Sequence, residues 1–75
     1  MDKDSLSELE TIWDEARSQI ESGHRDKAIE IYKYILLRYP DDPVASEYAN
    51  IYLGQLYVDL KKYGLAEKHI KAAIK

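Results

Sequence analysis

The sequence predicts an all-α protein made of two successive helix hairpins, and three observations support this fold class. Residues 23–32 and 61–70 follow a similar pattern, in which Ala28 and Ala66 take the same place. Apolar residues elsewhere recur at helical spacing, and no segment alternates long enough to form a strand. Self-similarity at such a period is typical of stacked helix pairs. We therefore expect one domain over residues 1–75, with one repeat at about 5–40 and the next at about 42–75.

The first hairpin is predicted from local signals at the ends of its helices. Ser5 and Glu8 fit a capping box at the start of the first helix. Gly23 closes that helix, since glycine readily adopts the backbone conformation that ends one. The second helix is expected over about residues 25–39 and is apolar nearly all round, which predicts burial on several sides. Pro40 ends it.

The second hairpin begins at a clear helix start. Asp42 is expected as the N-cap of the third helix, with Pro43 at its first position. This helix should end near Lys61 or Lys62, and Gly64 opens the fourth. Because the connections are short, sequential helices are expected to be antiparallel neighbours.

Three small residues are expected to set how closely the helices approach. Ala28 and Ala66 lie early in the second helix of each pair, and Gly54 lies within the third helix. A larger side chain at these positions would push the helices apart, at a cost of about 1–3 kcal/mol.

The composition excludes several function classes. The 75 residues are 45% apolar and 33% charged, with a formal net charge of -3, which argues against nucleic-acid binding. There is no cysteine, so we expect neither disulfides nor a thiolate metal site. No segment is long and apolar enough to span a bilayer, so a membrane protein is not expected. The polar, acidic first residues are unlike a signal peptide, which favours a cytoplasmic protein.

Charge is distributed unevenly along the chain. Residues 1–15 hold six acidic residues and one lysine, whereas residues 61–75 hold five lysines and one glutamate. One interpretation is complementarity with the helix dipoles, acids at the first N-terminus and bases at the last C-terminus. The other is head-to-tail self-association, in which the basic end of one copy meets the acidic start of another.

These motifs resemble the tetratricopeptide repeat (TPR) family over about residues 9–75. The Leu-Gly-x-x-Tyr motif of its first helix is similar to residues 53–57, and Ala66 and Ala73 match positions of its second helix. In the first repeat the matching residues are Ala16, Ala28, Tyr32 and Pro40. The chain departs from the family in its repeat length, the spacing from Ala28 to Ala66, which exceeds the usual unit of roughly 34 residues. It also has Ile70 in place of an aromatic residue, and Glu15 and Gln19 where Leu and Tyr are typical.

The resemblance implies a right-handed stack and a concave groove lined by the first helix of each repeat. The groove positions in this sequence are Glu10, Trp13, Arg17, Glu21, Tyr48, Ile51, Tyr52, Gln55 and Asp59. Family members that grip a terminal carboxylate use Lys and Asn at places that here hold Trp13, Arg17, Ile51 and Gln55. The carboxylate-clamp function is therefore not expected.

The remaining aromatic residues and histidines do not predict a catalytic or metal site. Tyr32 and Tyr57 match core positions, while Trp13, Tyr48 and Tyr52 either bind a partner or pack within the chain. His24 and His69 lack clustered carboxylates and are expected on the surface, so no metal or cofactor is predicted. No set of residues suggests catalysis.

The sequence thus predicts a non-enzymatic module that binds a protein or peptide in the groove. Aromatic contacts would supply affinity, while Arg17 and Asp59 would select charge. The alternative is a self-assembling structural adaptor, a homo-oligomer such as a homodimer, with no separate peptide ligand.

Overall fold

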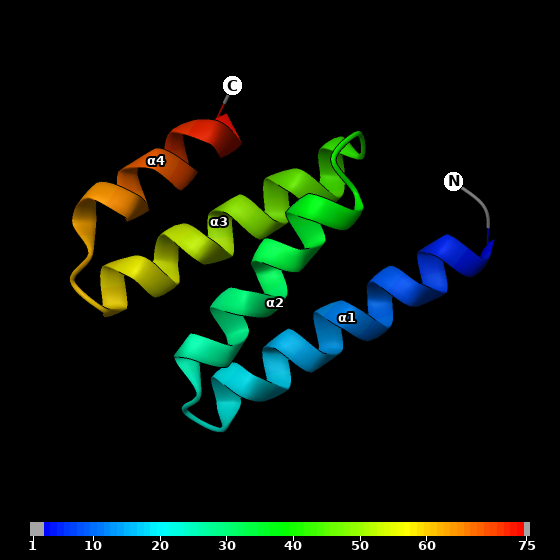
Figure 1. Cartoon of the computed structure of the whole chain (residues 1–75), viewed down its shortest axis with the longest axis horizontal. Coiled ribbons are helices and arrows are strands. Elements are labelled where there is room, and N and C mark those ends of the chain that lie inside the picture. Colours follow the sequence, from blue (N-terminus) through cyan, green and yellow to red (C-terminus); the bar gives the residue numbers. More distant parts are fainter. Residues whose placement is uncertain (1–2, 75) are drawn as a thin grey trace.

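The computed structural model describes residues 3–74, with side chains from residue 8 onward, and these residues form four α-helices. They are α1 (Lys3–Glu21), α2 (Arg25–Arg38), α3 (Pro43–Asp59) and α4 (Tyr63–Ile74). No strand occurs within these residues, which confirms the all-α prediction. Figure 1 shows that consecutive helices run in opposite directions.

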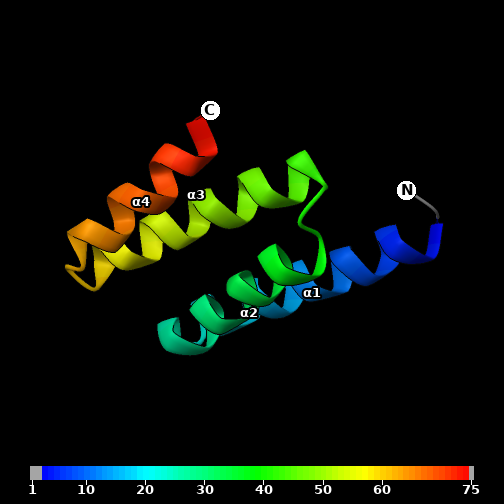
Figure 2. The ribbon, with the colours of Figure 1, turned by 45° about the horizontal axis from the view of Figure 1, so that its top comes forward.

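The helices form two hairpins packed beside each other. α1 contacts α2, α2 contacts α3, and α3 contacts α4. The turns within the two hairpins lie at the same end of the molecule, and the α2–α3 connection lies at the other (Figures 1 and 2). The Cα atoms extend over 37 × 31 × 14 Å. Two helices packed about 8–10 Å apart already span nearly the whole of this shortest dimension. The fold is therefore no more than two helices thick, and every helix keeps a solvent-exposed side.

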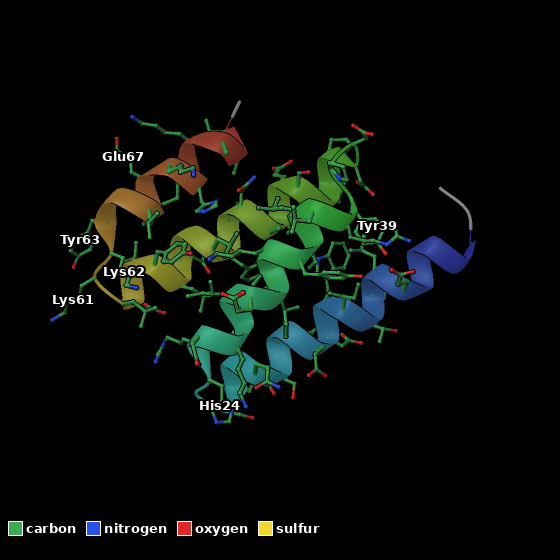
Figure 3. All side chains as sticks on the ribbon, viewed as in Figure 1. His24, Tyr39, Lys61, Lys62, Tyr63 and Glu67 are labelled. Carbon is green, nitrogen blue, oxygen red and sulfur yellow. The ribbon has the colours of Figure 1, made fainter. Side chains whose placement is uncertain are left out.

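The two hairpin turns have the same backbone geometry at equivalent places in the two repeats. Gly23 has φ 82° and Lys61 has φ 61°. In each turn two backbone N–H groups donate to carbonyl groups of the preceding helix. The nearer bond runs from Gly23 to Ile20 in the first turn and from Lys61 to Val58 in the second. The following residue donates one position further back, at 2.8 Å in both turns. This is the glycine-type helix ending predicted at Gly23. Figure 3 shows His24 at the turn between α1 and α2 and Lys61 at the turn between α3 and α4.

The core runs through both hairpins and contains mostly small and aliphatic residues. Its members are Leu9, Ala16, Ala28, Ile29, Tyr32, Ile35, Tyr39, Ala45, Ala49, Leu53, Leu56, Tyr57 and Ala66. Ala16, Ala28, Ala45 and Ala49 are completely buried. The buried positions of Tyr32 and Tyr57 confirm their prediction as core residues.

The close approach of α3 and α4 depends on Gly54. A Cβ atom built on this glycine would lie 2.5 Å from Ile70 Cγ1 and 3.5 Å from the carbonyl oxygen of Ala66. The first distance is shorter than carbon atoms tolerate, so only glycine fits without displacement of the Ile70 side chain. The predicted role of a small residue at this position is confirmed.

The predicted helix start at Asp42 is confirmed as well. Its carboxylate accepts hydrogen bonds from the backbone N–H groups of Val44 and Ala45, at 3.0 and 3.1 Å. Pro43 takes the first helical position, where no N–H group is needed. These bonds satisfy two of the free donors at the start of α3.

Other predicted helix ends shift by a few residues. α1 begins at Lys3, so Ser5 lies inside the helix and the predicted capping box is wrong. Its Glu8 instead pairs with Arg38 at the end of α2, with 3.3 Å between Oε1 and Nε. α3 ends at Asp59 rather than near Lys61, because Lys61 has a positive φ and an α-helix cannot continue through it.

Candidate functional site

A groove of about 650 Å³ opens between α1 and α3, with α2 beneath it. α1 supplies Trp13, Arg17, Ile20 and Glu21, α3 supplies Tyr48 and Tyr52, and α2 supplies Tyr32. The residues of α1 recur every three or four positions and those of α3 are four apart, so each set lies on one face of its helix. The helical period therefore brings four aromatic side chains into one depression.

The aromatic side chains pack in two pairs across the helices. Trp13 meets Tyr48 edge to face, with ring centroids 5.8 Å apart and planes at 73°. Tyr32 and Tyr52 stack, with centroids 5.2 Å apart and planes at 11°. Tyr48 and Tyr52 nevertheless keep 49% and 39% of their surface exposed. The same rings thus join α3 to the first hairpin and present apolar surface to a ligand.

The two residues predicted to select charge both have partners within the chain. Arg17 Nη2 lies 2.9 Å from Asp14 Oδ1, and Arg25 Nε lies 3.5 Å from Asp59 Oδ2. The Arg17 and Asp14 side chains are 67% and 72% exposed, and such surface pairs contribute about 0–1 kcal/mol. A charged ligand can therefore displace Asp14 from Arg17 at little cost.

Tyr32 forms the floor of the groove and is held in its neutral form. Burial, and then the neighbouring Tyr52, raise the pKa of Tyr32 to about 12, against the opposing positive charge of Arg17. The hydroxyl therefore stays protonated at all physiological pH values. It offers the groove a hydrogen-bond donor and no charge.

Of the nine residues predicted for the groove, the structure brings together five, namely Trp13, Arg17, Glu21, Tyr48 and Tyr52. Asp59 lies on α3 beside Arg25 and is not part of the lining. Gln55 lines a different recess, on the outer edge of α3 and α4. Glu10 is exposed on α1 and lies outside both.

Two lining residues had weaker signals in the sequence. Tyr32 matched a core position and is only 3% exposed, yet its edge reaches the groove floor. Ile20 belongs to the apolar stripe of α1 and was not distinguished from core residues. Ile20 lies about one helical turn after Arg17, and this spacing could have identified it as a groove residue.

The prediction that His69 is solvated is wrong. Its Nδ1 lies 2.8 Å from Asn50 Oδ1, and its ring stacks on Tyr57 with centroids 5.6 Å apart. Burial, and then the positive charges of Lys68 and Lys33, lower the pKa of His69 below its usual value. The pair joins α3 to α4 and gives the buried Asn50 a hydrogen-bond partner. His24, in contrast, is exposed at the first turn, as expected.

The described part of the chain lacks both a metal-binding cluster and a membrane-spanning helix. It contains no group of three or more histidine or acidic side chains placed to hold a metal ion. None of its helices combines the length and apolar character needed to cross a bilayer. Comparisons with family models, curated proteins and solved structures return no match for this chain.

Proposed function

We propose that this chain is a non-enzymatic protein–protein interaction module of the TPR type, which binds a peptide or protein segment in the groove between α1 and α3. The observation that carries the proposal is the convergence of Trp13, Tyr48 and Tyr52 on one depression. Aromatic side chains are enriched among residues that dominate binding energy. The net charge of -3 and the lack of cysteine agree with a protein ligand in the cytoplasm, and with no nucleic acid or cofactor.

The exposed ring of Tyr48 is the clearest contributor to affinity, and Tyr34 offers a matched control. Both are tyrosines in the middle of a helix, 49% and 48% exposed, but Tyr34 lies on α2 outside the groove. We expect Tyr48→Ala to weaken peptide binding at least tenfold, about 1.4 kcal/mol, and Tyr34→Ala to leave it unchanged.

A random peptide library displayed on phage supplies the ligand for this test. Enriched peptides are titrated against the wild-type chain and both variants, with the fluorescence of Trp13, the single tryptophan, as the readout. Circular dichroism verifies that both variants remain helical. Equal affinities for the two variants, or no peptide enriched over an unrelated helical protein, would exclude the groove as a binding site.

Self-assembly is the second candidate function, and exposed or partly exposed apolar side chains at both edges of the molecule favour it. Ile12, Ile31 and Tyr34 lie together on the outer side of the first hairpin, and Ile51, Ile70 and Ile74 lie together on that of the second. Such surfaces often mark protein contacts. Light scattering over a dilution series should then show a dimer dissociating to a monomer, and a constant monomer mass at high concentration would contradict it.

A further inference from the structure

We propose that the outer edge of α3 and α4 is a second binding surface, which takes an amphipathic helix from a partner protein. The partner helix carries small and tyrosine side chains in the order in which α3 presents them. This surface is separate from the groove and its role does not depend on the groove's function. The proposal follows from a repeated surface. On the first hairpin α3 covers it, and on the second hairpin the equivalent surface is open.

The covered interface is the surface on which α3 lies against the first hairpin. Trp13 contacts Tyr48 there, and Tyr32 stacks on Tyr52. Ile35 is completely buried between the helices. This part of the first hairpin is therefore a receptor surface for a helix, and its occupant in this chain is α3.

The same surface recurs on the second hairpin. A recess of about 520 Å³ on the outer edge of α3 and α4 is lined by Glu47, Ile51, Gln55, Ile70, Ala73 and Ile74. The equivalent positions one repeat length earlier hold Leu9, Trp13, Arg17, Tyr32, Ile35 and Leu36. Each of these earlier residues is buried, partly buried or lines the groove beside α3, whereas Ile74 at the recurring surface is 73% exposed.

The recess also has more room for an occupant than the equivalent surface of the first hairpin. Ile51 replaces Trp13, Ile70 replaces Tyr32, and Ala73 replaces Ile35, so each substitution removes volume from the receptor surface. An occupant with the aromatic rings of α3 fills this space. On α3 those rings alternate with completely buried alanines, in the order Ala45, Tyr48, Ala49, Tyr52.

A second copy stacked head to tail does not supply this pattern. In a head-to-tail stack, α1 of the next copy would take the place that α3 takes on the first hairpin. Its residues at the positions of Tyr48 and Tyr52 are Glu10 and Asp14. Placing these carboxylates against isoleucines costs free energy, because charged groups lose their hydration there.

Charge gives the partner helix a further property. Leu9 and Arg17 of the covered surface become Glu47 and Gln55 at the recess, so the open surface is more negative than the covered one by two charges. The partner helix is therefore expected to be more basic than α3. This complementarity should raise the association rate and weaken as salt is added.

The experiment uses α3 itself as the probe. A fluorescein-labelled peptide of residues 43–60 is titrated against the full chain and followed by fluorescence anisotropy. We expect saturable binding, which becomes tighter at low salt when Glu47 of the peptide is replaced by Lys. A control peptide with Tyr48→Glu and Tyr52→Asp, the residues of α1 at the equivalent positions, should bind at least about tenfold more weakly.

Three variants of the full chain locate the bound peptide. Ile74→Glu places a charge in the recess and should weaken binding at least fivefold, on the order of 1 kcal/mol. Leu37→Glu changes an aliphatic residue of α2 that is 81% exposed, lies outside the recess and serves as the matched control. Arg17→Ala tests for binding in the groove instead, and should leave the affinity unchanged. Circular dichroism establishes that each variant is folded.

Several results would overturn the proposal. They are the absence of saturable binding, equal affinity for the control peptide, or a loss with Leu37→Glu or Arg17→Ala as large as that with Ile74→Glu. Dimerisation of the full chain, measured by light scattering over a dilution series and abolished by Ile74→Glu, would show that a second copy occupies the recess, which contradicts a partner helix of the stated pattern.

Discussion

At the scale of single residues, Gly54 determines how closely α3 and α4 pack. The nearest neighbour of an added Cβ is Ile70 Cγ1, an inner atom of a branched side chain, so the whole side chain must move to accept it. Alanine favours a helix over glycine by about 1 kcal/mol. Overpacking costs about 1–3 kcal/mol, so the steric effect outweighs the helix propensity.

We therefore predict that Gly54→Ala lowers the free energy of unfolding by about 1 kcal/mol. Urea denaturation followed by circular dichroism measures the change. The matched control introduces Gly54→Ala into an Ile70→Ala background, where the clash is absent and alanine should be neutral or stabilising. A loss of the same size in both backgrounds would show that Ile70 is not the cause.

His69 makes the stability of the fold depend on pH. Since the pKa of His69 is lowered in the folded chain, the unfolded chain binds the proton more readily. The contribution of neutral His69 is complete above its unfolded pKa, about 6.5. It is lost as the pH falls through that value toward the lower folded pKa.

We predict that the free energy of unfolding decreases between pH 7.5 and pH 5.5, and that His69→Gln reduces this decrease. Urea titrations at both pH values provide the measurement, and His24→Gln, at the exposed first turn, controls for the loss of a histidine. If His24→Gln reduces the pH dependence as much as His69→Gln does, the partly buried position of His69 is not responsible.

At the scale of elements, the two hairpin turns use one backbone geometry with different residues. Gly23 adopts a positive φ without steric cost, whereas Lys61 pays the cost of its Cβ atom. Lys61 takes the place of Gly23 in the second repeat, so the internal repeat could have predicted this turn although no glycine marks it.

Lys61→Gly should therefore raise the free energy of unfolding by about 1 kcal/mol, since it relieves the left-handed conformation. Thermal and urea denaturation measure the gain. Lys62→Gly is the matched control, because it removes the same charge from a residue without a positive φ and should not stabilise. Equal gains from both changes would point to charge rather than backbone conformation.

Features that depend on neighbouring residues in the sequence could be predicted, whereas contacts between distant residues could not. Asp42 and Pro43 form a cap within one turn of the chain, and the sequence was sufficient to predict it. Asn50 and His69 lie far apart in the sequence, and the pairing of Arg25 with Asp59 joins different helices. Neither pair leaves a local pattern, so the environment of His69 and the pairing of Asp59 required the three-dimensional arrangement.

The groove shows the same distinction between helical period and tertiary contact. Spacing along α1 and α3, read through the family resemblance, was enough to predict Trp13, Arg17, Tyr48 and Tyr52 as neighbours. It could not separate them from Gln55, because the angle between the hairpins decides which part of α3 meets α1.

At the scale of the whole molecule, α4 is less deeply buried than α2 and α3. Ala66 is the only fully buried residue of that helix, whereas α2 and α3 bury several each. Local opening is governed by the buried contacts that it breaks. We predict that the amides of α4 exchange with solvent at a lower free energy than those of α2 and α3.

Native-state hydrogen exchange measured by NMR at increasing urea tests this prediction. The α4 amides should exchange through an opening that depends little on urea, while α2 and α3 should follow global unfolding. Identical free energies and urea dependences for all four helices would instead show that the two hairpins unfold as one cooperative unit.

The carboxylates of Glu10 and Asp14 on α1 have a consequence for any tandem fusion of this chain. Two copies joined through a flexible linker would place these acids at the junction, where continued stacking needs tyrosines. The fused units should then melt independently, each at the temperature of a single copy. Replacing both acids by tyrosine is the smallest change that would let a concatemer extend as one continuous rod.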